Sequence, residues 1–65
     1  MNLREWKKLN RWTATAIAQE IGVSPSTITG VELGLNKPSL MLAKNIVRFT
    51  NGEVTLKDLG VEEKP

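Results

Sequence analysis

The chain of 65 residues is long enough for one small domain only. It contains no cysteine and no histidine, which excludes disulfide bonds and the usual zinc ligands and leaves no thiolate or imidazole for catalysis. A domain of this size buries only about 60% of the surface that the unfolded chain exposes, so its core is thin and packing alone must hold it. We therefore expect no enzyme, no metal site and no cofactor.

The net charge of +2 is unevenly distributed along the chain. Residues 1–50 carry seven basic and three acidic side chains, whereas residues 51–65 carry two basic and four acidic ones. Such a division is more often a solvated surface than a binding site, but it also suits a protein that binds a polyanion. We expect one domain at residues 1–60 and a frayed acidic tail at 61–65. Because the sequence has no export signal and no membrane span, we expect a cytoplasmic protein with no membrane partner.

The N-terminal part of the chain predicts two short helices, at residues 2–10 and 14–21. Thr13 stands where the second helix can be capped, and Gly22 supplies the left-handed residue that ends it. Both segments have apolar side chains at helical spacing. These are Leu3, Trp6 and Leu9 in the first segment, and Ala14, Ile17, Ala18 and Ile21 in the second.

A third helix is predicted at residues 25–33, with Ser24 as its cap and Pro25 at its first position. At about 100° per residue, Ile28 and Val31 form a narrow core stripe, and four other residues lie on the opposite side. These four are Ser26, Thr29, Gly30 and Leu33. The outer face is thus small, rich in hydroxyl groups and uncharged, which is unusual for a helix face that only meets water.

The C-terminal part predicts a fourth helix, which is capped by Ser39 and ends near residue 51, and then an extended Val54. Thr55 and Asp58 have a spacing like that of a capping box, which predicts a short fifth helix. The expected fold is therefore all-α with five helices. The alternative is an α+β fold in which the residues after 51 form a pair of strands.

Two short helices joined by a turn that contains Gly22, with Ser24 capping the second helix, form a helix-turn-helix pattern. Over about residues 3–59 the sequence resembles the lambda-repressor/Cro (XRE-type) family of DNA-binding proteins. Its length is similar to that of short regulators from phages and mobile elements. The positions that carry the resemblance are Thr13, Ile17, Ala18, Ile21, Gly22, Val23, Ser24, Ile28, Val31, Glu32, Gly34, Pro38, Ser39 and Leu40.

The resemblance implies a compact lambda-repressor-like domain that inserts the helix at 25–33 into the major groove of DNA, which is about 12 Å wide. The predicted base-facing residues are Pro25, Ser26, Thr27, Thr29 and Gly30. Ser26 and Thr27 stand in the first turn, where they are best placed to reach base edges. Each position also has a structural interpretation, because Ser and Thr suit a first turn and Gly30 could serve tight packing in a dimer.

Contacts with DNA phosphates are predicted on both sides of this helix. Asn36 and Lys37, in the loop that follows it, resemble the segment with which the family clamps the DNA backbone. The residue after the Thr13 cap is commonly Gln in the family, and Ala14 removes its phosphate contact, so Thr15 and the helix N-terminus must replace it. The predicted phosphate-contacting residues are Thr13, Thr15, Asn36, Lys37 and Arg11.

Lys7 and Glu32 match positions that pair in many relatives and brace the first helix against the third, so we interpret them as structural. Lysine stands here in place of the more usual arginine, which makes a bidentate contact unavailable. The base-facing set also lacks Gln, Asn and Arg, the residues that contact bases in bidentate geometry. Direct readout of bases is therefore expected to be sparse and supplemented by readout of DNA shape.

We expect a sequence-specific transcription regulator, a repressor, that binds a palindromic operator in double-stranded DNA as a homodimer, because one module this small reads too few bases. Val54 and the short helix around Leu56 and Leu59 are the predicted dimer surface. The alternative is a protein-interaction module, such as an antitoxin, that uses the same fold to hold a partner protein. Leu33 and the missing bidentate residues leave room for that function.

Overall fold

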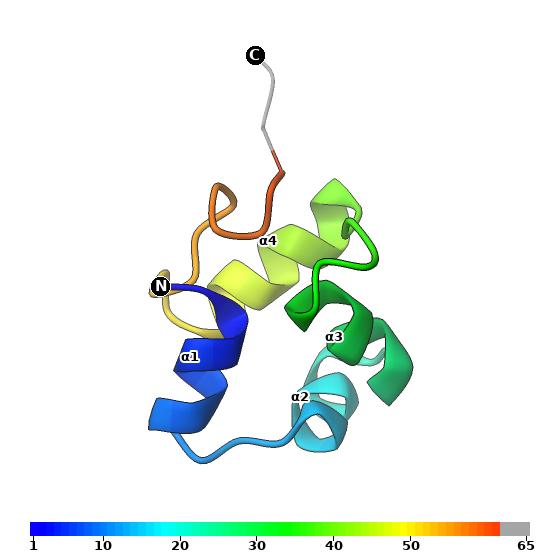
Figure 1. Cartoon of the computed structure of the whole chain (residues 1–65), viewed down its shortest axis with the longest axis vertical. Coiled ribbons are helices and arrows are strands. Elements are labelled where there is room, and N and C mark those ends of the chain that lie inside the picture. Colours follow the sequence, from blue (N-terminus) through cyan, green and yellow to red (C-terminus); the bar gives the residue numbers. More distant parts are fainter. Residues whose placement is uncertain (62–65) are drawn as a thin grey trace.

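A computed structural model of the protein describes residues 1–61 and has four helices in this range (Figure 1). They are α1 (Leu3–Leu9), α2 (Ala14–Ile21), α3 (Pro25–Glu32) and α4 (Leu40–Phe49). α2 and α3 pack side by side, while α1 and α4 meet through their aromatic side chains near the C-terminal segment. Residues 1–61 contain no strand, so the all-α prediction is confirmed and the strand-pair alternative is not. No helix of this range is long and apolar enough to cross a membrane.

Two of the predicted N-caps are confirmed by side-chain hydrogen bonds. The hydroxyl of Thr13 accepts a hydrogen bond from the N–H of Ala16 at 3.1 Å, and that of Ser39 accepts one from the N–H of Leu42 at 3.2 Å. Each bond satisfies one of the N–H groups that the first turn of a helix leaves without a partner. The start of α2 and of α4 is therefore determined by local sequence.

All four helices end in the same reversal of the chain. A residue with positive φ follows the last turn, and the next N–H donates to the carbonyl five positions before it, as in the Schellman motif. The residues with positive φ are Arg11, Gly22, Gly34 and Asn51. The bonds run from Trp12 N to Lys7 O, from Val23 N to Ala18 O, from Leu35 N to Gly30 O and from Gly52 N to Val47 O, and they measure 2.8 to 2.9 Å.

The predicted fifth helix is instead a single turn. Thr55 and Asp58 do form a reciprocal capping box, with Thr55 N donating to Asp58 Oδ2 at 3.0 Å and Asp58 N donating to Thr55 Oγ1 at 3.1 Å. Gly60, with a φ of 74°, then reverses the chain before a second turn can form. Val61, where the frayed tail was expected to begin, is buried, and the rest of that tail, residues 62–65, lies outside the described residues.

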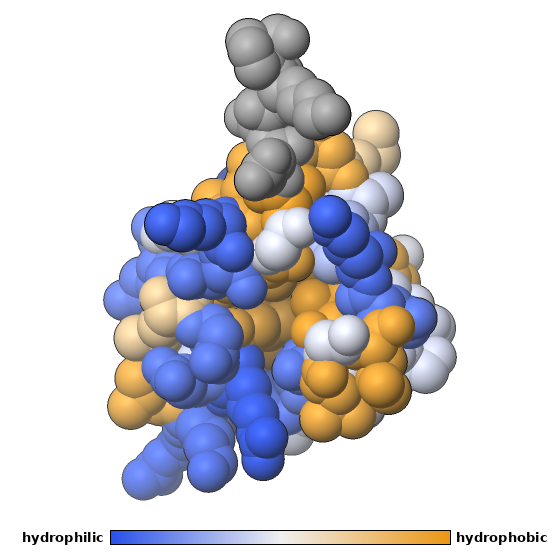
Figure 2. Space-filling model, turned by 45° about the horizontal axis from the view of Figure 1, so that its top comes forward, coloured by the Kyte–Doolittle hydropathy of each residue, from blue (hydrophilic) through white to orange (hydrophobic). Residues whose placement is uncertain are grey.

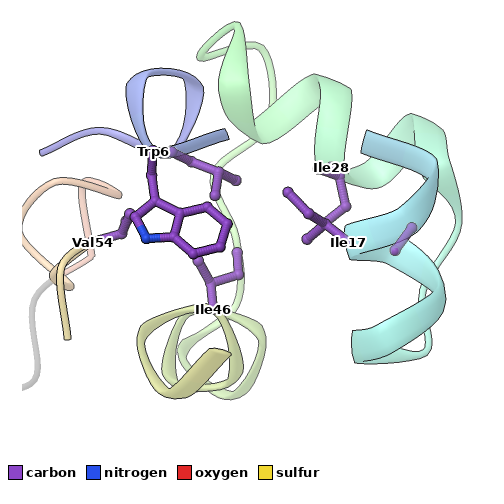
Figure 3. Close-up of a cluster of buried hydrophobic side chains, with 7 residues drawn as sticks. Trp6, Ile17, Ile28, Ile46 and Val54 are labelled. Atoms are coloured by element: carbon purple, nitrogen blue, oxygen red, sulfur yellow. The ribbon is translucent and has the colours of Figure 1, made fainter. Parts of the chain in front are cut away.

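The core contains apolar side chains from every helix and from the C-terminal segment. In Figure 3, Ile17 of α2 and Ile28 of α3 lie against each other, and Trp6 and Ile46 fill the space between α1 and α4. Val54 closes this side of the core and is fully buried. The prediction that Val54 belongs to a dimer surface is therefore wrong, because its side chain is needed inside the domain.

Polar contacts attach the C-terminal segment to the N-terminal helix. The indole N–H of Trp6 donates to a carboxylate oxygen of Glu53 at 2.6 Å. The amino group of Met1 donates to the backbone carbonyl of Glu53 at 3.0 Å and to Asp58 Oδ2 at 3.1 Å. Residues that are about fifty positions apart thus hold each other in place, which closes the domain around its core.

Candidate nucleic-acid interface

The face of α3 that points away from the core carries no charge. Its exposed residues, including the one that caps its C-terminal end, are Pro25, Ser26, Thr29 and Leu33. Its buried and half-buried residues are Thr27, Ile28, Gly30, Val31 and Glu32. Compared with the prediction, the helix is rotated about its axis, so that Thr29 moves toward the middle of the outer face and Thr27 and Gly30 move away from it.

The prediction that Gly30 faces DNA bases needs correction. Gly30 is buried, because the loop after α3 folds back over it. The carbonyl of Gly30 accepts hydrogen bonds from the N–H groups of Leu35 and Asn36 at 2.9 and 3.2 Å. A Cβ atom at this position would overlap the amide group of Asn36. The glycine therefore leaves room for the side chain of Asn36, which lies over it.

Hydrogen bonds among the hydroxyl groups organise the first turn of α3. Ser24 occupies the N-cap position, but its side chain does not cap a backbone N–H. Its hydroxyl instead lies 3.2 Å from that of Ser26 and 2.8 Å from that of Thr27. One turn later, the hydroxyl of Thr29 donates to the backbone carbonyl of Pro25 at 3.2 Å. The hydroxyl groups of Ser26, Thr27 and Thr29 are thus all hydrogen-bonded within the chain.

The five predicted phosphate-contacting residues are all exposed and lie in segments on either side of α3. In Figure 1, α2 lies below α3 and the loop after α3 lies above it. Thr13 and Thr15 belong to the start of α2, and Asn36 and Lys37 to that loop. Thr13 Oγ1 accepts the capping bond, so its own hydrogen remains available to an oxygen outside the protein.

Arg11 stands in the turn between α1 and α2 with a φ of 56°. A residue other than glycine pays about 1–2 kcal/mol in this left-handed region, because Cβ approaches the following carbonyl. Within the described residues the side chain of Arg11 makes no hydrogen bond or ion pair that could repay this cost. Among residues 1–61, its guanidinium group therefore has no partner.

Lys7 and Glu32 form an ion pair between α1 and α3, with 3.0 Å between Nζ and Oε2. The Glu32 side chain is only 7% exposed. Its other oxygen, Oε1, is buried without a hydrogen-bond partner among the described residues. The pair holds the C-terminal end of α3 against α1, and it orients the outer face of α3.

Figure 2 shows how hydrophilic and hydrophobic side chains are distributed over one face of the molecule. Hydrophilic side chains gather at the left, and a hydrophobic patch lies at the lower right, below a band of hydrophilic ones. No group of three or more acidic side chains within residues 1–61 could hold a metal ion. The most exposed large apolar side chains near α3 are Leu33 (57%), Leu35 (75%) and Met41 (76%).

A protein-family model described as Helix-turn-helix matches residues 3–57, which is most of the chain. The chain belongs to the XRE-type helix-turn-helix family. This confirms the resemblance seen in the sequence and makes the protein a member of a family of DNA-binding regulators. No curated protein and no solved structure matches the chain.

In this XRE-type protein, α2, the turn around Gly22 and α3 make up the helix-turn-helix unit. Sequence reasoning overlooked the exposed Leu35 and Met41, which flank the loop between α3 and α4. Their only signal was that an apolar residue stands directly before the polar run Asn36-Lys37 and another a few residues after it. That signal is weak, because single exposed apolar residues are common on protein surfaces.

Proposed function

We propose that the protein is a sequence-specific transcriptional regulator, acting as a repressor, that binds a palindromic operator as a homodimer. The observation that supports this most is the uncharged, exposed face of α3, which lies between two segments with donors for phosphate oxygens. A helix with such a face enters the major groove without placing charge against the base edges. The flanking segments then contact the two sugar-phosphate walls of the groove.

Each flank offers a different kind of phosphate contact. The backbone N–H groups at the start of α2, together with the Thr13 and Thr15 hydroxyl groups, suit a phosphate because a helix N-terminus carries a partial positive charge. Lys37 and Arg11 add full positive charges, and Asn36 adds an amide donor. Base contacts would come from Pro25, Ser26 and Thr29, with Thr27 at the edge and Gly30 excluded by its burial.

We base the proposed homodimer on the small surface that one protomer can present to DNA bases. α3 has eight residues and is therefore about 12 Å long, so that it spans only a few base pairs. Two copies related by a two-fold axis read two half-sites about one helical turn of DNA apart. A dimer on its operator also occupies DNA that other proteins would use, and this is the basis for proposing repression.

The test is selection of bound duplexes from a random pool, followed by affinity measurements at physiological ionic strength. We expect an inverted repeat, and an affinity for it about a thousandfold higher than for a scrambled duplex. Ser26→Asp should abolish this preference, whereas Asn51→Asp, which adds the same charge on an exposed turn after α4, should not. An aspartate in the first turn of α3 is favourable for the helix, so lost binding would not reflect unfolding. Equal affinity for both duplexes would contradict the proposal.

A second candidate is a protein-interaction module, which the exposed Leu33, Leu35 and Met41 favour. In that case a partner protein would bury these side chains, and the exposed face of α3 would make no contact with DNA bases. The Ser26→Asp variant separates the two proposals, because it leaves these three residues unchanged. Retention of biological function in that variant would favour the protein-interaction module.

A further inference from the structure

The middle of the exposed face of α3 is occupied by Thr29. With Ser26 at the origin and about 100° per residue, the exposed arc runs from about −100° at Pro25 to Ser26 itself. Thr29 lies at about −60°, close to the centre of this arc, and Leu33 lies at about −20°. Thr29 is therefore the side chain that a groove-bound α3 directs most squarely at the base edges.

The hydroxyl group of Thr29 is turned back toward its own helix. Its hydrogen is donated to the carbonyl of Pro25, at 3.2 Å, so it is not available to an acceptor on a base. This bond also restricts χ1, and it leaves the methyl group as the part of the side chain that no contact holds to the backbone. Because the hydroxyl group is bonded to the backbone, the methyl group is the part of the exposed Thr29 side chain that remains for a contact outside the chain.

The surroundings of this methyl group are apolar or already hydrogen-bonded. The pyrrolidine ring of Pro25 has no donor, and Leu33, 57% exposed, continues the apolar strip one turn further along the helix. The Ser26 hydroxyl lies 3.2 Å from that of Ser24. No side chain of this face has the donor–acceptor pair with which Gln or Asn reads a base, or the two donors with which Arg does.

We infer that Thr29 is a specificity-determining residue and that its methyl group reads the C5-methyl group of a thymine in each half-site. Among the four bases only thymine presents a methyl group in the major groove, and threonine methyl groups pack against it. The inference rests on the proposed function and adds to it the base class that the face of α3 selects. The operator should therefore have a conserved thymine opposite the middle of α3.

The experiment uses the selected duplex and replaces each thymine by uracil, one symmetric pair at a time. Uracil lacks only the methyl group. Each lost contact should weaken binding about fourfold, so a symmetric pair, which removes one contact from each half-site, should weaken it about sixteenfold. One pair of positions should show this loss for the unmodified protein. Thr29→Val keeps the methyl group and replaces the hydroxyl group by a second methyl group, so the loss should persist. Thr29→Ser keeps the hydroxyl group and removes the methyl group, so the loss should disappear.

Both variants change an exposed side chain, and circular dichroism checks that each remains helical. A half-site without thymine, a uracil substitution without effect at every position, or an undiminished loss in Thr29→Ser would each overturn the inference. These outcomes leave the proposed function intact, because the selected duplex would still bind more tightly than a scrambled one. If no duplex is preferred at all, both the proposed function and this inference fail.

Discussion

The carboxylate group of Glu32 makes only part of the hydrogen bonds that it could make. Lys7 bonds one of its carboxylate oxygens, and the other is buried without a partner among the described residues. An ammonium group is a single point of charge, whereas the guanidinium group of arginine can donate to both oxygens at once. A buried acceptor without a partner costs about 1–3 kcal/mol.

We therefore predict that Lys7→Arg raises the free energy of unfolding by about 1 kcal/mol, since it supplies a donor to Glu32 Oε1. Chemical denaturation followed by circular dichroism measures this change. Lys8→Arg is the matched control, because Lys8 is an exposed neighbour on the same helix and should have little effect. An equal gain in both variants would mean that the free oxygen of Glu32 is not the cause.

At position 11 the backbone conformation favours one residue type and the proposed function another. Its φ of 56° favours glycine, whereas its positive charge serves a phosphate contact under the proposed function. We predict that Arg11→Gly leaves the free energy of unfolding unchanged or raises it by about 1 kcal/mol, and lowers DNA affinity about tenfold. Thermal denaturation and a binding titration measure the two effects.

Asn51→Gly provides the comparison for Arg11→Gly, because Asn51 has a φ of 54° at the end of α4 and carries no charge. It should show the same effect on stability with no loss of DNA affinity. If both variants lose affinity, or if neither does, Arg11 is not a phosphate contact.

Among the elements, the capping box after α4 makes stability depend on pH. The backbone N–H of Thr55, together with the amino group of Met1 and the Thr55 hydroxyl, lowers the pKa of Asp58 from 3.8 to about 2. Because the folded chain has the lower pKa, the stabilisation is fully present above about pH 4 and is lost as the pH falls through about 2.

We predict that Asp58→Asn is less stable than the unmodified protein at pH 5 and that this difference shrinks toward pH 2. Thermal midpoints measured across this range report the change. Glu20→Gln, at an exposed position of α2, should instead retain the pH dependence of the unmodified protein. An unchanged pH profile in Asp58→Asn would show that this carboxylate has the same pKa in the folded and unfolded chain.

Elements with local signals were predictable from sequence, and those that depend on distant contacts were not. The caps Thr13 and Ser39 and the ends at Gly22 and Asn51 are set by residues within one helical turn, so all four helices were located to within about two residues. The burial of Gly30 depends on a loop that folds back over it, and that of Val54 on α1 and α4. A helical wheel contains neither contact. The missing loop over Gly30 is the reason why the outer face of α3 was predicted with the wrong centre.

At the scale of the whole molecule, the proposed function makes DNA affinity depend on salt. A dimer that neutralises about four to six phosphates should lose affinity with a slope of about −4 to −5 in a plot of log affinity against log salt. Lys37→Gln removes one contact from each protomer, so its slope should be smaller by about 2. Fluorescence anisotropy at several salt concentrations measures these slopes.

Lys57→Gln is the control for this measurement, since Lys57 is an exposed lysine in the C-terminal turn, outside the proposed interface. Its slope should equal that of the unmodified protein. Equal slopes for all three proteins would remove Lys37 from the interface.

The central claim is that the exposed face of α3 is the surface that binds DNA. Backbone amide chemical shifts recorded while the selected duplex is added test this claim most directly. We expect the largest changes on residues 26–29, with further changes around Arg11, Thr13 and Lys37. Changes confined to the apolar surface around Leu35 and Met41, with residues 26–29 unaffected, would contradict the claim.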